Sequence, residues 1–413
     1  MQPAFYLDQG LPQTFTPPPI IRDDYDNGKG ILYRPADANK RPYAHQWNVT
    51  VDRELGRNLS LSVAYVGSAG RRLPSSIAPI NAINPSYLSM GDALNNEFTP
   101  GQASLDGVPA PYAGWAQQLI DNGCAPSVAQ ALSPYPQYCS TLQGLNENHG
   151  TSHYNSLQMK LEKRFSGGTY ALVSYTLSKT MESASSNTQR DATTWSGLQG
   201  VMSPFEQSRN ESIASTDTPQ VLSAAFVYEL PAGPGKKHMN SGIGAWVLGG
   251  WQASTIFRFS SGLPTYFRSG FCNVPGQFRA ACIPAITNGG SVFAQDKGSF
   301  DPAKGPLFNK DAFESVDAFN FYYGHGNLLE ESVRGFGYHN QDLSLIKNTR
   351  MGGGTNFQFR FEIFNMWNWH TFSSSGEFGN VAFNNDVSKG DFGEWNGSVT
   401  DPRTMQVALR FEF

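Results

Sequence analysis

A strict alternation of apolar and polar residues is the feature that most constrains this chain. It recurs in nine separate segments, and in residues 356–365 three phenylalanines and an isoleucine alternate with Gln, Arg and Glu. Successive side chains of a β-strand point to opposite faces, so a period of two predicts a strand with one apolar and one polar face. The predicted strands are residues 46–55, 58–66, 155–165, 170–177, 221–230, 251–260, 342–348, 356–365 and 404–413.

The spacing of these segments predicts how the strands are connected. The intervening stretches are 2, 88, 4, 43, 20, 81, 7 and 38 residues long, so short and long connections alternate. Outer-membrane barrels join their strands by short periplasmic turns and long extracellular loops, whereas a Greek-key sandwich gives no reason for this alternation. Most segments are also close to the 9–11 residues of a membrane-crossing strand. We therefore predict an all-β fold: an antiparallel transmembrane β-barrel, partial, with about nine strands and long extracellular loops.

The composition agrees with this prediction. Charged residues make up 15% of the chain, against roughly 25% in soluble domains, and aromatic residues make up 13%. The mean hydropathy is −0.39, and the sequence contains no run of about 18 uncharged apolar residues of the kind that a membrane helix needs. We expect the protein in the cell outer membrane, in contact with its lipid. A secreted or surface β-rich adhesion or carbohydrate-binding domain is the alternative.

The strand count predicts the domain organisation. Single-chain bacterial barrels have an even number of strands, and nine is odd. The N-terminus has neither a basic region nor an apolar stretch of the kind found in signal peptides. We therefore expect residues 1–43 to be a residual extracellular loop or linker, and residues 44–413 to be the C-terminal part of a barrel.

Two sets of residues suggest membrane functions. The last strand ends on an aromatic residue, as the strands recognised by the outer-membrane insertion machinery do, and its predicted insertion signal consists of Met405, Val407, Leu409, Phe411 and Phe413. Aromatic residues near strand ends form girdles at both membrane interfaces of such barrels. The predicted girdle residues are Trp47, Tyr65, Phe165, Tyr170, Tyr228, Trp251 and Phe259.

Charged residues gather on the polar face of the predicted strands, and their signs alternate. They are Lys160, Glu162, Arg258, Arg360, Glu362, Arg410 and Glu412. We interpret them as a solvated inner wall with cross-strand ion pairs, such as Arg360 with Glu412 or Glu362 with Arg410.

The four cysteines fall into two close pairs, Cys124 with Cys139 and Cys272 with Cys282, both in predicted extracellular loops. Two local disulfides suit an exported protein; unpaired thiols or a metal site are the alternatives, although neither pair has the CxxC spacing of zinc sites.

No catalytic motif is evident, because the sequence contains no GxSxG elbow and no complete phosphate-binding loop. We expect a non-enzymatic protein without cofactor or metal. The net charge of −4 argues against nucleic acid as a partner.

Several short motifs occur in an order and spacing that resemble a known family. They are Gln46-Trp47-Asn48-Val49, Val63-Ala64-Tyr65-Val66-Gly67-Ser68, Tyr154-Asn155-Ser156-Leu157-Gln158, Lys163-Arg164-Phe165, Ser174-Tyr175-Thr176-Leu177-Ser178-Lys179, Tyr228-Glu229-Leu230-Pro231, Gly250-Trp251-Gln252, Ser261-Gly262-Leu263-Pro264, Asp342-Leu343-Ser344-Leu345, Lys347-Asn348, Phe361-Glu362-Ile363-Phe364-Asn365 and Asp401-Pro402-Arg403.

From about residue 43 onward the chain resembles the barrel of TonB-dependent receptors of the Oar-like kind, which bear a carboxypeptidase regulatory domain. The resemblance implies a 22-stranded barrel filled by an N-terminal plug and energised by the TonB complex. This sequence has no plug, no TonB box and no regulatory domain, so a TonB partner is expected only if a plug precedes it. An unknown extracellular ligand would be bound mainly by the 88- and 81-residue connections.

Overall fold

The computed structural model describes residues 25–75, 80–139, 142, 144–145, 147–183, 205–269, 273–275, 282–287, 291–315, 321–322, 324–327, 329–351, 354–373 and 382–413. All nine predicted segments are strands of one antiparallel sheet, in which each strand pairs with its neighbour along the chain. The strands are β1 (Tyr43–Gly56), β2 (Leu59–Ser75), β5 (Glu147–Ser166), β6 (Thr169–Ser183), β8 (Gln220–Glu229), β9 (Trp251–Ser260), β12 (Tyr338–Arg350), β13 (Asn356–Phe364) and β14 (Thr404–Glu412).

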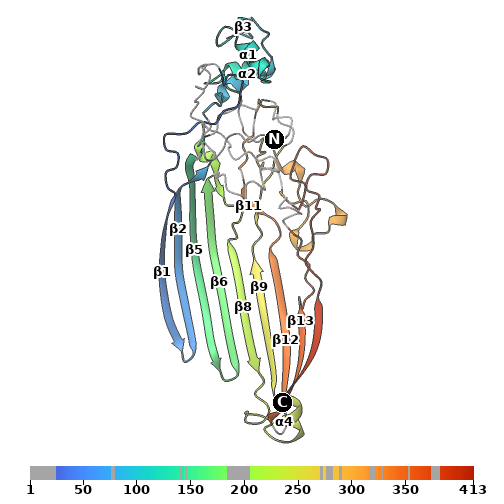
Figure 1. Cartoon of the computed structure of the whole chain (residues 1–413). Helices are drawn as coiled ribbons and strands as arrows, with labels where there is room; N and C mark the ends of the chain where they lie inside the picture. The colour runs from blue at the N-terminus through green and yellow to red at the C-terminus, as the bar shows by residue number, and fades with distance from the viewer. Residues whose placement is uncertain are drawn as a thin grey trace, which may run out of the picture.

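The sheet forms a wall with its short turns at one end and its long connections at the other (Figure 1). The short turns are built from residues that tolerate a left-handed backbone. Gly167 and Gly168, between β5 and β6, have φ values of 59° and 78°, and Asn58, between β1 and β2, has a φ of 67°. Two-residue hairpins need this conformation because it matches the twist of the strands that they join.

Five strands extend three or more residues beyond their predicted ends, toward the long connections. β1 begins at Tyr43 and β12 at Tyr338. β2 continues to Ser75, β5 begins at Glu147 and β6 continues to Ser183. These extensions carry no apolar–polar alternation, and the far ends of β2, β5 and β6 are covered by protein, since Ser75, Glu147 and Ser183 are buried. The short β7 (Glu211–Ile213) pairs with the end of β6 at this level.

The sheet is open in the described part of the chain. β1 pairs only with β2, and β14 pairs only with β13, so each has one free edge. Every residue of β1 is exposed as a result.

The long connections contain the remaining elements. They are η2 (Pro85–Asn95), β3 (Ser104–Leu105), β4 (Val108–Pro109), α1 (Trp115–Asp121), α2 (Val128–Ala131), η3 (Gln207–Asn210), β10 (Pro264–Thr265), η5 (Lys297–Ser299), η6 (Pro302–Lys304), η7 (Lys310–Ala312) and β11 (Glu330–Arg334). A further helix, α4 (Gly242–Leu248), lies at the turn end between β8 and β9 (Figure 1). No helix in the described residues is long and apolar enough to cross a membrane.

The hydrophobic cores lie in these connections rather than against the sheet. The first loop core, in the β2–β5 connection, is built around Ile83, Leu94, Phe98, Trp115 and Leu119. The second loop core is mainly aromatic and joins the β9–β12 and β13–β14 connections; it contains Phe267, Phe300, Leu307, Phe308, Phe313, Val333, Phe383, Val387 and Phe392.

The segment before β1 packs on the β2–β5 connection. The Gly28 N–H donates to the Gln137 carbonyl over 2.7 Å, and the Cys139 N–H donates to the Lys29 carbonyl over 3.0 Å. The part of residues 1–43 that the structure describes therefore lies at the loop end.

Candidate functional site

The strand register gives the sheet two chemically distinct faces. Residues paired between neighbouring strands lie on the same face, so a row can be followed across the wall. One apolar row runs through Val51, Val63, Met159, Tyr175, Leu222 and Phe259. The adjacent row on the opposite face runs through Asp52, Ser62, Lys160, Ser174, Ser223 and Arg258.

Within the described part of the chain, the apolar face has no protein covering. On strands with neighbours on both sides, Leu157 is 38% exposed, Leu177 45% and Phe226 43%. A continuous exposed apolar surface of this extent indicates a membrane or protein contact, and in a membrane wall the lipid tails take the place of a protein core. The apolar face is therefore the lipid-facing surface, and the polar face is the inner wall.

The register places most of the predicted girdle on the lipid-facing surface. Trp47 on β1 and Tyr65 on β2 lie in apolar rows. Tyr228 on β8, and Trp251 and Phe259 near the two ends of β9, also lie in apolar rows. The indole of Trp47 covers Gly67, where an added Cβ would approach within 2.3 Å of the ring. Phe165, beside the β5–β6 turn, is 54% exposed.

Tyr170 does not belong to this girdle. It pairs with Val227, between the apolar-face pairs formed by Thr169 with Tyr228 and by Ala171 with Phe226. Its side chain is therefore on the inner wall, because neighbouring residues of a strand alternate between faces.

Sequence reasoning missed two further aromatic residues on the lipid-facing surface. Trp369 lies 6.4 Å from Phe257 and 4.7 Å from His339, measured between ring centroids. The Trp367 indole N–H donates to the Gln341 side-chain oxygen over 2.8 Å. The sequence signal that could have identified them is the occurrence of two tryptophans just after the alternating segment 356–365.

The predicted cross-strand ion pairs of the inner wall are wrong. Arg360 faces Ala408 in the register, and Arg410 faces Gln358, so neither predicted pair is directly opposed. The ion pairs instead run along single strands, between residues two apart: Lys160 with Glu162 at 2.9 Å, Arg360 with Glu362 at 3.9 Å, and Arg410 with Glu412 at 2.9 Å.

The predicted insertion signal lies at the free edge of the sheet. Met405, Val407, Leu409 and Phe411 are directly opposite Ile363, Phe361, Phe359 and Phe357, which makes an apolar ladder along β13 and β14. Phe411 is 56% exposed, and Phe413, just beyond β14, is fully exposed.

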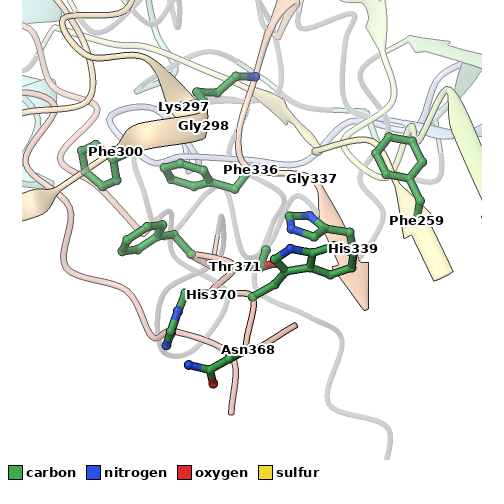
Figure 2. A pocket seen from close by; sticks show the side chains of 12 residues that line it. Phe259, Lys297, Gly298, Phe300, Phe336, Gly337, His339, Asn368, His370 and Thr371 are labelled. Carbon is green, nitrogen blue, oxygen red and sulfur yellow. The ribbon is translucent and has the colours of Figure 1, made fainter. Parts of the chain in front are cut away.

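Two pockets lie at the loop end of β9 and β12. The larger has a volume of about 660 Å³ and is shown in Figure 2. Phe336 stands between Phe300 and His339 in this view, with Lys297 on one side and His370 on the other. The other residues that line this larger pocket are Phe259, Gly298, Gly337, Asn368, Trp369, Thr371 and Phe372.

The smaller pocket has a volume of about 380 Å³ and shares Phe336, Thr371 and Phe372 with the larger one. The two pockets open on opposite faces of the sheet. The larger contains Phe259 and His339, which lie on the lipid-facing surface, whereas the smaller contains Ser260 and Tyr338, their neighbours on the inner wall. We call the smaller one the inner rim pocket. Neither pocket is lined by the 88-residue connection that was expected to be a main ligand contact. That connection lines a separate pocket of about 700 Å³, which contains Tyr112, Gln118 and Tyr138.

A buried ion pair holds the rim together. Arg334 donates to the Asp217 carboxylate over 2.7 Å, to the Asp217 carbonyl over 2.9 Å and to the Gly262 carbonyl over 3.3 Å. The second carboxylate oxygen of Asp217 accepts the Thr180 N–H over 2.7 Å. The Asp217 side chain is only 1% exposed. This clamp fastens the β6–β8 and β9–β12 connections to each other and to β6.

Burial shifts the pKa of two ionisable groups near the rim. Lys297 lines the larger pocket, and burial, with the nearby Arg334 charge, lowers its pKa. Burial raises the pKa of the Glu330 carboxyl, although bonds from Asn327 oppose the rise.

A disulfide joins Cys124 to Cys139, beside the first loop core. Cys282 is also disulfide-bonded, while Cys272 lies outside the described residues. The described residues contain no group of three or more His, Cys, Asp or Glu side chains that could hold a metal ion.

Comparison with known proteins gives a matching family and a similar solved structure. Among solved structures, the chain is similar to the outer membrane transporter YddB from Escherichia coli, with 9% sequence identity and a TM-score of 0.38, over 92% of this chain and 34% of that one. The chain thus spans about a third of the length of that transporter. No curated protein matches the sequence. The family model of the outer membrane beta barrel domain matches residues 1–406, so the chain belongs to this outer-membrane family.

Proposed function

We propose that this chain forms part of the barrel of a TonB-dependent receptor or transporter of the Oar-like kind. In this role the strands provide the membrane wall, and the long connections provide the surface that meets an extracellular ligand. The observation that carries the proposal is the two-faced antiparallel wall with every long connection at one end. The motifs from Gln46-Trp47-Asn48-Val49 to Asp401-Pro402-Arg403 support the finer assignment.

The proposed role requires no catalysis by this chain. The wall excludes lipid from the interior, the inner rim pocket lies where a solute enters, and β14 presents its apolar ladder to the insertion machinery. Coupling to the TonB complex would come from a plug domain, which is a separate part of such receptors. A secreted adhesion domain is not retained as an alternative, because the family is one of the outer membrane.

Two experiments test the proposal at its two levels. Expression of the complete reading frame that contains residues 1–413, behind a signal peptide, should give an outer-membrane protein that migrates faster on a gel before boiling than after, as folded barrels do. A soluble product would contradict the barrel assignment.

The TonB assignment is tested separately. The complete reading frame around this sequence should encode a plug, and uptake of its ligand should stop in cells without TonB. Uptake at the same rate without TonB would remove the finer assignment and leave the barrel untouched.

A further inference from the structure

The inner rim pocket is built from hydroxyl groups and aromatic rings. Three separate connections converge on it, because its residues come from the end of the β6–β8 connection, from the β9–β12 connection with the adjoining ends of β9 and β12, and from the β13–β14 connection. It is lined by Thr218, Ser260, Ser261, Gly262, Leu263, Phe336, Tyr338, Thr371, Phe372, Ser373, Ser398, Val399 and Thr400. Its volume of about 380 Å³ is in the range of small-molecule sites, roughly 300–1,000 Å³.

Several of these hydroxyls are available to a ligand. Among the described residues, the side-chain hydroxyls of Ser260, Tyr338 and Ser398 make no hydrogen bond with the protein. Tyr338 is 41% exposed. Each hydroxyl can both donate and accept a hydrogen bond, so the pocket offers paired donor and acceptor capacity at several points.

The aromatic rings supply a second type of contact. Phe336 and Phe372 pack with their ring centroids 5.2 Å apart, and the Tyr338 ring adds another face to the same lining. Aromatic faces carry partial negative charge and therefore attract the weakly positive C–H groups of a sugar ring.

The lining contains no Asp, Glu, Lys, Arg or His side chain. The nearby charges of Asp217 and Arg334 are already paired at 2.7 Å. A charged ligand would lose its hydration here without gaining an opposite charge, which is costly. The larger pocket differs in this respect, because Lys297, His339 and His370 line it.

The pocket is also held rigidly. Gly262 sits so close to the link between β11 and β12 that an added Cβ would lie 2.1 Å from the Gly335 carbonyl oxygen. The Thr371 N–H donates to the Thr400 hydroxyl over 3.0 Å and fixes two further lining residues. A preformed site of this kind binds without first ordering its loops.

We propose that the inner rim pocket binds a neutral saccharide, taken as a free oligosaccharide from outside the cell. This assignment rests on the proposed function, since it places the site at the entrance of the barrel interior. A saccharide offers many hydroxyls, apolar ring faces and no charge, which matches each property of the lining. The inner-wall position argues for a soluble ligand rather than a lipid headgroup.

The test uses the complete receptor that contains this chain, in detergent micelles, shown to be folded by its heat-modifiable gel mobility. The labelled protein is applied to an array of neutral and acidic oligosaccharides, and the best neutral ligand is then titrated by calorimetry. Tyr338→Phe, which removes one hydroxyl, should weaken binding about three- to tenfold. Ser398→Trp, which fills the pocket from an exposed loop position, should abolish it.

Matched controls carry the same changes elsewhere. Tyr228→Phe alters the lipid-facing surface and Ser104→Trp alters the remote β3, so both should bind like the parent chain. Folded protein that binds no neutral saccharide, that prefers acidic ones or lipopolysaccharide, or whose binding survives Ser398→Trp overturns the inference and leaves the barrel standing. A chain without heat-modifiable mobility overturns the proposed function, and the inference falls with it.

Discussion

At the scale of single residues, the rim depends on charges that are buried and paired. Asp217 accepts bonds from Thr180 and Arg334, so its carboxylate has partners although it is almost fully shielded from water. Such a pair adds little net stability by itself, but removing one partner leaves a buried charge without compensation. The geometry of the rim therefore depends on both residues being present.

Arg334→Met should cost about 3–5 kcal/mol in rim stability, because it leaves the buried Asp217 carboxylate unpaired. Denaturant titration followed by near-ultraviolet circular dichroism measures this. Combining it with Asp217→Asn should restore much of the loss. Lys304→Met is the control: it breaks the exposed pair of Lys304 with Asp301 and should cost under about 1 kcal/mol. Equal losses of stability for Arg334→Met and Lys304→Met would contradict the stabilising role of the Arg334–Asp217 pair.

The raised pKa of Glu330 predicts that the stability of the same region depends on pH. Its folded-state pKa is raised from 4.5, chiefly by burial, so the neutral carboxyl is the form that folding favours. Stability at the pairing of β10 with β11 is complete below the unfolded pKa and falls as pH rises through the folded pKa. Glu330→Gln should remove this fall. Hydrogen exchange of the amides of Thr265 and of residues 330–334, corrected for intrinsic rates between pH 4 and pH 7, checks it; parallel profiles for both proteins would refute the prediction.

At the scale of elements, each strand owes its function to the face that the register assigns to it. Leu345 lies between Ala253 and Phe361 in an apolar row, whereas its neighbour Ser344 lies between Ser254 and Glu362 on the inner wall. Two adjacent residues of one strand thus meet different solvents.

A lysine should therefore have opposite consequences at these two positions. Leu345→Lys places a charge in lipid and should cost about 2–4 kcal/mol if it lies near the middle of the membrane, whereas Ser344→Lys meets water and should cost little. Urea unfolding of the chain in lipid vesicles measures both changes. A larger cost for Ser344→Lys would reverse the assignment of the two faces.

The apolar ladder of β14 leads to a prediction about assembly in the outer membrane. Phe411→Asn combined with deletion of Phe413 removes the two terminal aromatic side chains from the apolar ladder of β14, and burial of such a side chain contributes about 1.5–3 kcal/mol. We expect roughly tenfold less heat-modifiable protein in the outer membrane. Ala408→Asn, on the inner face of the same strand, is the matched control. Unchanged assembly of the doubly altered chain would remove β14 as an insertion signal.

At the scale of the whole molecule, the sheet and the connections are stabilised by different environments. The wall buries its apolar face in lipid, while the connections build their own cores at the loop end. Eight successive antiparallel pairings separate β1 from β14, so these edge strands run in the same direction. A fully antiparallel barrel that contains this sheet needs an odd number of further strands between the two edges.

This division predicts separate unfolding of the first loop core. Replacing Cys124 and Cys139 by Ser opens a 15-residue loop and should cost that core about 3 kcal/mol. Hydrogen exchange should rise in residues 115–132 and stay unchanged in 157–177. Loss of heat-modifiable mobility in this variant would show that the wall and the core are a single cooperative unit.

The sequence by itself determined the nine strands, their order, the two ends of the wall and its apolar face, because each depends on a local period of two and on the lengths between periods. It could not determine the partners across strands. The predicted pairing of Arg360 with Glu412 required a register that only the assembled sheet fixes, and Arg360 and Arg410 instead pair with Glu362 and Glu412, two residues along their own strands. Tyr170 lies on the inner wall because it directly precedes Ala171, which belongs to an apolar row. Residues such as Asp217, Arg334 and Ser398 are far apart in the sequence and carry no periodic signal. Only the tertiary structure brings them together at the rim, where the long connections fold over the ends of the strands.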